Sequence, residues 1–139
     1  VIGIIAIIST VLMANFAGIR ERNRDAKRKA DLNEIKTALE LYRTDHGQYP
    51  VRGSGTGQYP TGCGGSNRLM GLTNGAVYLN VVPCDPLSSS TIVYTYQSPS
   101  PFSAYTLTAC VENIRDKDAI SSDTTTCGAT KRPYRVINP

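Results

Sequence analysis

Four cysteines are the residues of this chain whose type and spacing most directly point to chemistry. Cys63, Cys84, Cys110 and Cys127 form no CxxC pair and lack a histidine at zinc-site spacing, so we expect no zinc site. Two disulfides in an exported domain fit the pattern better. Four cysteines allow three pairings. We favour Cys63–Cys84 and Cys110–Cys127, because each pair closes a local loop between neighbouring elements.

Enzyme chemistry is not indicated. The one histidine, His46, lies near the end of a helical pattern, where a solvent-exposed side chain is favoured by the helix dipole. The sequence contains no HExxH, GxSxG or GxxxxGK[ST] motif, and no cysteine is paired with a histidine. We therefore predict neither catalysis nor an organic cofactor.

One long helix should position the remaining features. Val1–Ala14 carries no charge, whereas the chain becomes strongly polar from Arg20, and no proline interrupts residues 1–46. A straight helix of that length would measure about 70 Å, more than the rest of the chain can bury. Residues 1–19 must therefore contact lipid or other subunits. The apolar side chains expected in such a core are Val1, Ile4, Ile5, Ile7, Ile8, Val11, Leu12 and Phe16.

Residues 20–46 should form the amphipathic half of the same helix. Leu32, Ile35, Leu39 and Tyr42 recur at spacings of three and four, which predicts a stripe that packs on a sheet. Gly47 is expected just after the end of the helix.

The basic segment of this helix admits two readings. Six of the 15 Lys and Arg residues lie between Arg20 and Lys29. We interpret the segment as a solvated face with i,i+4 pairs such as Asp25–Lys29. A nucleic-acid groove is the less favoured reading.

Residues 47–139 should form a small globular head. Alternating apolar and polar residues predict strands, SPSPFS at Ser98–Ser103 predicts a hairpin connection, and a glycine-rich stretch suggests a short helical turn near Ser66–Leu72. The fold class expected is α+β, with the long helix packed on a small antiparallel sheet and a loop-rich, disulfide-stapled C-terminal region. The expected strands are Thr91–Gln97, Ala104–Val111 and Tyr134–Ile137.

The chain contains, in this order, VIGIIAIIS at Val1–Ser9, the helical segment Ala30–Pro50 and YLNVVPCDP at Tyr78–Pro86. Together these three segments resemble the type IV pilin and type II secretion pseudopilin superfamily. VIGIIAIIS at Val1–Ser9 is similar to the interior of its N-terminal signature, whose Thr-Leu-Ile-Glu start is missing here, and we expect the chain to begin inside a longer precursor. Ala30–Pro50 resembles the end of its long helix. YLNVVPCDP at Tyr78–Pro86 resembles a loop of form YL-x-x-VP-x-DP.

The resemblance implies a structural subunit that polymerises through its N-terminal helix. We expect a major type IV pilin in a cell-surface pilus, with an inner-membrane pool before assembly. The pilus assembly machinery and a prepilin peptidase would be its partners, and we expect no nucleic-acid partner. A type II pseudopilin in a periplasmic pseudopilus is one alternative. A membrane-anchored monomeric binding protein is the other.

Calcium is the one metal that the resemblance suggests, because similar type II pseudopilins carry a calcium-binding loop late in the chain. Asp116, Asp118 and Asp123 lie in a comparable region, although the Gly-rich acidic loop is not reproduced. The four cysteines, including Cys84 inserted in the DP loop, also differ from typical pseudopilins and favour a surface pilus.

Overall fold

The computed structural model of the 139-residue chain describes residues 2–73, 75–87, 94–123, 125–128 and 130–138, with side chains from residue 18 onward. One long helix precedes a set of short strands, which confirms the predicted α+β class. The elements are α1 (Ile2–His46), β1 (Val51–Arg52), β2 (Gln58–Tyr59), β3 (Leu69–Met70), β4 (Val77–Leu79), β5 (Thr95–Gln97), β6 (Thr106–Val111) and β7 (Arg132–Ile137).

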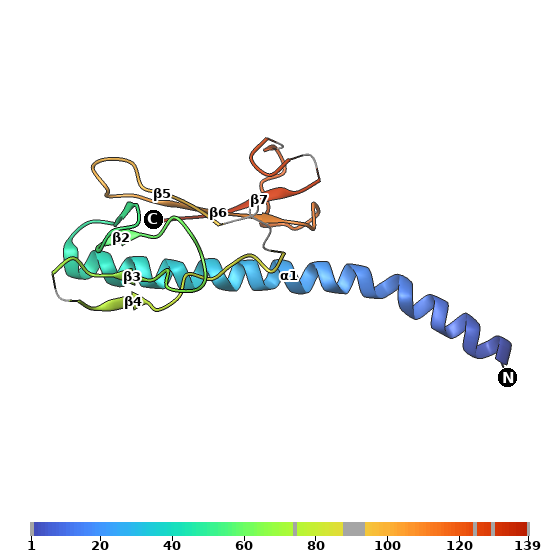
Figure 1. Cartoon of the computed structure of the whole chain (residues 1–139). Helices are drawn as coiled ribbons and strands as arrows, with labels where there is room; N and C mark the ends of the chain where they lie inside the picture. Colours follow the sequence, from blue (N-terminus) through green and yellow to red (C-terminus); the bar gives the residue numbers. More distant parts are fainter. Residues whose placement is uncertain (1, 74, 88–93, 124, 129, 139) are drawn as a thin grey trace.

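The C-terminal half of α1 lies along the head, and its N-terminal half extends away from it (Figure 1). The helix ends as the sequence predicts. Gly47 adopts φ +76° and its N–H donates to the carbonyl of Arg43 at 2.7 Å. Glycine favours this left-handed conformation because it has no Cβ, and the bond satisfies a carbonyl of the last turn.

The apolar stripe of α1 is buried against the head. Leu32, Ile35 and Leu39 are 0% exposed and Tyr42 is 2% exposed. The helix contacts β4, β6 and β7, so the stripe packs on the sheet as its helical spacing predicts.

The main sheet has the order β5-β6-β7 with antiparallel pairing. Tyr96, Leu107 and Val136 are cross-strand partners, and all three are buried, so this row of the sheet contributes to the core. β6 and β7 confirm two predicted strands. β5 matches the end of the third, and residues 91–93 of that prediction lie outside the described residues.

Two small sheets complete the head: β1 pairs with β2 in parallel, and β3 pairs with β4 antiparallel. The predicted helical turn at Ser66–Leu72 is wrong, because β3 occupies this segment. Its backbone groups bond across to the following segment: Val82 N–H donates to Asn67 O at 2.8 Å, and Gly71 N–H donates to Ala76 O at 2.8 Å. These cross-segment bonds take the place of bonds along a helix.

Among the residues whose side chains are described, no helix is both long and apolar enough to cross a membrane. The predicted filament-core positions lie outside that set. They are Val1 itself and the side chains of Ile4, Ile5, Ile7, Ile8, Val11, Leu12 and Phe16.

Candidate functional site

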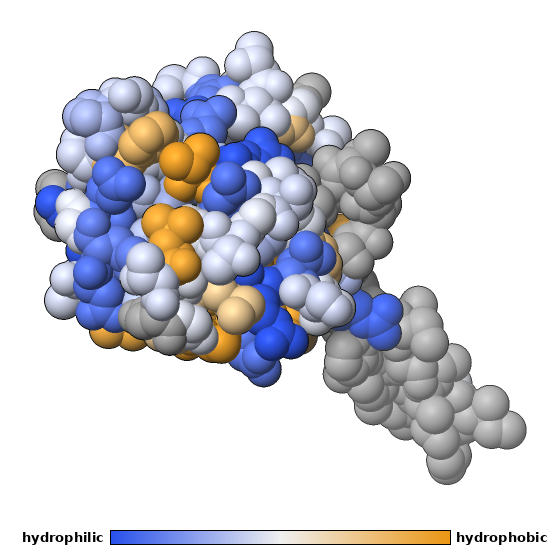
Figure 2. Space-filling model, turned by 60° about the vertical axis from the view of Figure 1, so that its left-hand side comes forward, coloured by the Kyte–Doolittle hydropathy of each residue, from blue (hydrophilic) through white to orange (hydrophobic). Residues whose placement is uncertain are grey.

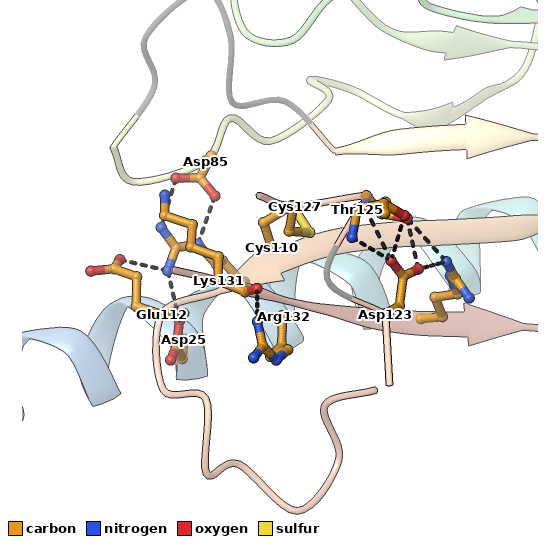
Figure 3. Close-up of a disulfide and its surroundings, with 12 residues drawn as sticks. Asp25, Asp85, Cys110, Glu112, Asp123, Thr125, Cys127, Lys131 and Arg132 are labelled. Atoms are coloured by element: carbon orange, nitrogen blue, oxygen red, sulfur yellow. Dashed lines mark hydrogen bonds and ion pairs between the residues drawn. A yellow bond between two sulfur atoms is a disulfide. The ribbon is translucent and has the colours of Figure 1, made fainter. Parts of the chain in front are cut away.

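A fully buried guanidinium lies where α1 enters the head. Arg28 is 0% exposed. Its Nε and Nη2 donate to the two carboxylate oxygens of Asp85 at 2.6 and 3.0 Å. Its Nη1 donates to Asp25 Oδ1 at 2.6 Å and to Glu112 Oε1 at 2.7 Å. Figure 3 shows these three carboxylates converging from different parts of the chain. We call Arg24, Asp25, Arg28, Asp85 and Glu112 the charged junction.

Three separate elements supply the carboxylates of the charged junction. Asp25 lies one turn before Arg28 on α1, Asp85 follows β4, and Glu112 directly follows β6. Backbone groups fix two of them. Asp25 accepts from the backbone N–H of Glu112 at 2.9 Å and of Asn113 at 2.8 Å, and Asp85 accepts from Leu87 N–H at 2.9 Å. The carboxylates of Asp25 and Asp85 therefore have partners besides the arginine.

A second arginine completes the junction. Arg24 donates from Nε and Nη2 to Glu112 at 2.8 and 2.6 Å, a bidentate pair that is partly exposed. The hydrogen bond from Arg24, together with that from Arg28, outweighs partial burial and lowers the pKa of Glu112 to about 2. Hydrogen bonds and the charge of the carboxylates likewise outweigh the burial of Arg28, so its pKa is raised. Glu112 and Arg28 are therefore ionised near neutral pH.

The interpretation of Arg20–Lys29 as a solvated helix face is wrong at two positions, Asp25 and Arg28. Arg28 and Asp25 are buried, because the head folds over this side of α1. The expected Asp25–Lys29 pair is replaced by two others: Asp25 pairs with Arg28, and Lys29 pairs with Asp116 and Asp118.

No sequence pattern identifies the central residues of the junction, which are Arg28, Asp85 and Glu112, as site residues. One signal was present, because Asp85 belongs to the YLNVVPCDP segment that carries the resemblance.

Both disulfides lie beside the junction. Cys63–Cys84 has a Cα–Cα distance of 5.2 Å and Cys110–Cys127 has one of 5.5 Å. These are the two pairs favoured from the sequence because each closes a local loop. Cys84 immediately precedes Asp85. Cys110 stands two residues before Glu112 (Figure 3). Each disulfide therefore anchors a segment that carries an acidic partner of Arg28.

The three calcium candidates do not come together. Asp116 and Asp118 both accept from Lys29 Nζ. Asp123 instead accepts from Arg135 and from the hydroxyl of Thr126. Within the described ranges, no group of three or more His, Cys, Asp or Glu residues could hold a metal ion. Since calcium requires six to eight oxygen ligands, the arrangement does not fit it.

His46 is a packing residue rather than an exposed one. Its ring stacks on Tyr42 with centroids 4.2 Å apart, and its side chain is partly buried. Nδ1 lies 3.0 Å from Tyr42 O, and Leu72 N–H donates to Nε2 at 3.3 Å. A neutral ring protonated on Nδ1 satisfies both contacts. The prediction that His46 is solvent-exposed is therefore wrong.

The charged junction has the chemistry of a structural clamp. Its ion pairs and hydrogen bonds join α1 to two distant segments of the head. A family model described as "Type II secretion system (T2SS), protein G" matches residues 15–118, which include the whole junction. No curated protein and no solved structure matches the chain significantly.

Proposed function

Because the chain belongs to the family of the type II secretion system protein G, we propose that it is a pseudopilin, a structural subunit that polymerises into a periplasmic pseudopilus. The family match over residues 15–118 is the observation that carries this proposal. It favours the pseudopilin alternative over the surface pilin that we expected from the sequence. The family consists of structural subunits of a secretion system rather than enzymes.

The shape of the chain supports polymerisation. α1 spans 45 residues, about 68 Å at 1.5 Å per residue, and its N-terminal half projects from the head (Figure 1). In our proposal residues 1–19 form a stalk, residues 20–46 join it to the head, and residues 47–139 form the head. The stalk lies in the inner membrane before assembly and packs against the stalks of other copies afterwards. Head-to-tail contacts build a helical fibre when the rotation between copies does not close into a ring, and we propose that arrangement here.

The head surface is suited to the outside of a fibre. On the face shown in Figure 2, apolar side chains are scattered among polar ones. Isolated apolar side chains are ordinary on a surface that faces water. The proposed partners are further copies of the chain, a prepilin peptidase and the assembly machinery of the secretion system.

A surface type IV pilus is the second candidate. The two disulfides favour it, because the four cysteines differ from typical pseudopilins. Deletion of the gene separates the two candidates. Exoproteins that accumulate in the periplasm, with surface fibres unchanged, support the pseudopilin. Loss of surface fibres with normal secretion supports the pilin.

Polymerisation itself is tested by placing a charge in the stalk. We expect Ile8→Asp to abolish filaments while the head stays folded, because a carboxylate is costly among packed apolar helices. Ile114→Asp is the matched control, since Ile114 is already 51% exposed on the head. Filaments are counted by electron microscopy in cells that overproduce each variant. Normal filament numbers with Ile8→Asp would refute the role of the stalk.

A further inference from the structure

The loop that follows β6 is folded around an aspartate. Asp116 N–H donates to Asn113 O at 3.0 Å, and Ala119 N–H donates to Asp116 O at 3.1 Å. The carboxylate of Asp116 also accepts from Asp118 N–H at 2.9 Å. These bonds place the carboxylates of Asp116 and Asp118 together on one side of the loop. We call residues 113–119 the acidic loop.

A lysine of α1 fills the space between these carboxylates. Lys29 Nζ lies 2.8 Å from both carboxylate oxygens of Asp116 and 2.8 Å from Asp118 Oδ2. An ammonium has three N–H donors, and three carboxylate oxygens surround it. The ring of Tyr134 lies 5.3 Å from the same nitrogen, within the range of a cation–π contact.

Lys29 and Asp116 are the sheltered members of this cluster, whereas the side chain of Asp118 is 45% exposed. The side chains of Lys29 and Asp116 are 23% and 16% exposed. Although partial burial opposes ionisation, the hydrogen bond from Lys29 holds the pKa of Asp116 below its usual value. The Lys29–Asp116 ion pair is therefore present throughout the neutral range.

The position of the ammonium conflicts with the calcium loop that the family resemblance implies. Calcium would need to lie about 2.3–2.6 Å from these same oxygens, where it would meet the Lys29 ammonium and be repelled by it. The third candidate ligand is also engaged elsewhere, since Asp123 is bound by Arg135.

We propose that Lys29 takes the place of a divalent cation in this chain. Its ammonium, carried by the helix itself, holds the acidic loop against α1, so the head folds without calcium. This inference concerns the folding of the subunit. It stands or falls independently of whether the filament is a pseudopilus or a pilus.

The test uses the full chain purified in detergent, with thermal unfolding and hydrogen exchange as readouts. We expect the wild-type chain to have the same melting temperature in excess calcium chloride and in EDTA. Lys29→Met should accelerate amide exchange in residues 113–119 by about fivefold, the ratio expected when a sheltered ion-pair cluster is lost. Lys27→Met is the matched control, because the one ion pair of Lys27 within the described part of the chain is with Asp31 on the same helix. It should leave exchange in the acidic loop unchanged.

Two results would overturn the inference. The first is a wild-type chain whose melting temperature falls in EDTA or rises in calcium chloride. The second is a Lys29→Met variant whose acidic loop exchanges at the wild-type rate. If Lys29→Met does not fold, the calcium and EDTA comparison of the wild-type chain decides the question alone.

Discussion

Replacement of Arg28 by methionine should strongly destabilise the head. The substitution keeps an unbranched apolar side chain but leaves Asp25 and Asp85, which are 3% and 2% exposed, without their cation. Removing one partner of a buried ion pair costs about 3–5 kcal/mol. Both carboxylates keep backbone N–H donors. We therefore expect a loss near the lower end, about 3 kcal/mol.

The matched control is Arg24→Met on the same helix. Among the described residues Arg24 pairs with Glu112 alone, and its side chain is 27% exposed, so its removal should cost much less than that of Arg28. A double variant, Arg28→Met with Asp85→Leu, should recover part of the loss because it also removes a stranded charge.

Urea unfolding of the full chain in detergent measures these differences. The near-ultraviolet signal of the eight tyrosines is the appropriate probe, because it reports on the packed head rather than on helix content. An Arg28→Met variant that is no less stable than Arg24→Met would refute the proposed role of the buried Arg28 ion pairs. A double variant that is less stable than Arg28→Met would contradict the stranded-charge explanation.

Three further outcomes follow from the structure. The pKa of Glu112 is about 2 in the folded chain against an ordinary 4.5, so the stabilisation of the fold by its carboxylate is complete above pH 4.5 and is lost as the pH falls toward 2. The curve of unfolding free energy against pH should therefore be flatter for Glu112→Gln than for the wild-type chain across this window. Parallel curves would exclude the effect. Cys110→Ser should lower the free energy of unfolding by about 3 kcal/mol, and an unchanged melting temperature under oxidising conditions would count against this bridge. Gly57→Ala and Gly47→Ala both place alanine at a positive φ, but only at Gly57 would the new Cβ meet Leu72 Cγ, at 2.1 Å. In urea unfolding Gly47→Ala should cost about 1 kcal/mol and Gly57→Ala more than about 2 kcal/mol, with equal losses as the contrary result.

Local patterns explain the part of the fold that could be predicted. The stripe of Leu32, Ile35, Leu39 and Tyr42 is recognisable because a helix repeats every 3.6 residues, whatever it packs against. The end of α1 at Gly47 follows for a similar reason, since glycine alone accepts a positive φ without strain.

The charged junction could not be predicted in the same way. Arg28 lies 57 residues from Asp85 and 84 residues from Glu112, and no periodicity links them. A basic segment on a helix is usually solvated, so burial of Arg28 becomes visible only when the head is folded over it. The aspartates after β6 illustrate the same limit. The closeness of three aspartates in the sequence suggests calcium as a common ligand. In the fold, however, Asp116 pairs with Lys29 and Asp123 pairs with Arg135.

The charged junction also determines how tension would pass through a subunit. In a fibre held together by stalks, as we propose, a pull enters each head along α1 from its N-terminal half. The first ion pairs with the head that it reaches are those of Arg24 and Arg28. From Arg24 to Tyr42 the contacts extend over about 27 Å of helix axis, so they share the load in shear instead of opening one after another. The disulfides beside Asp85 and Glu112 carry that load onward into covalently closed loops.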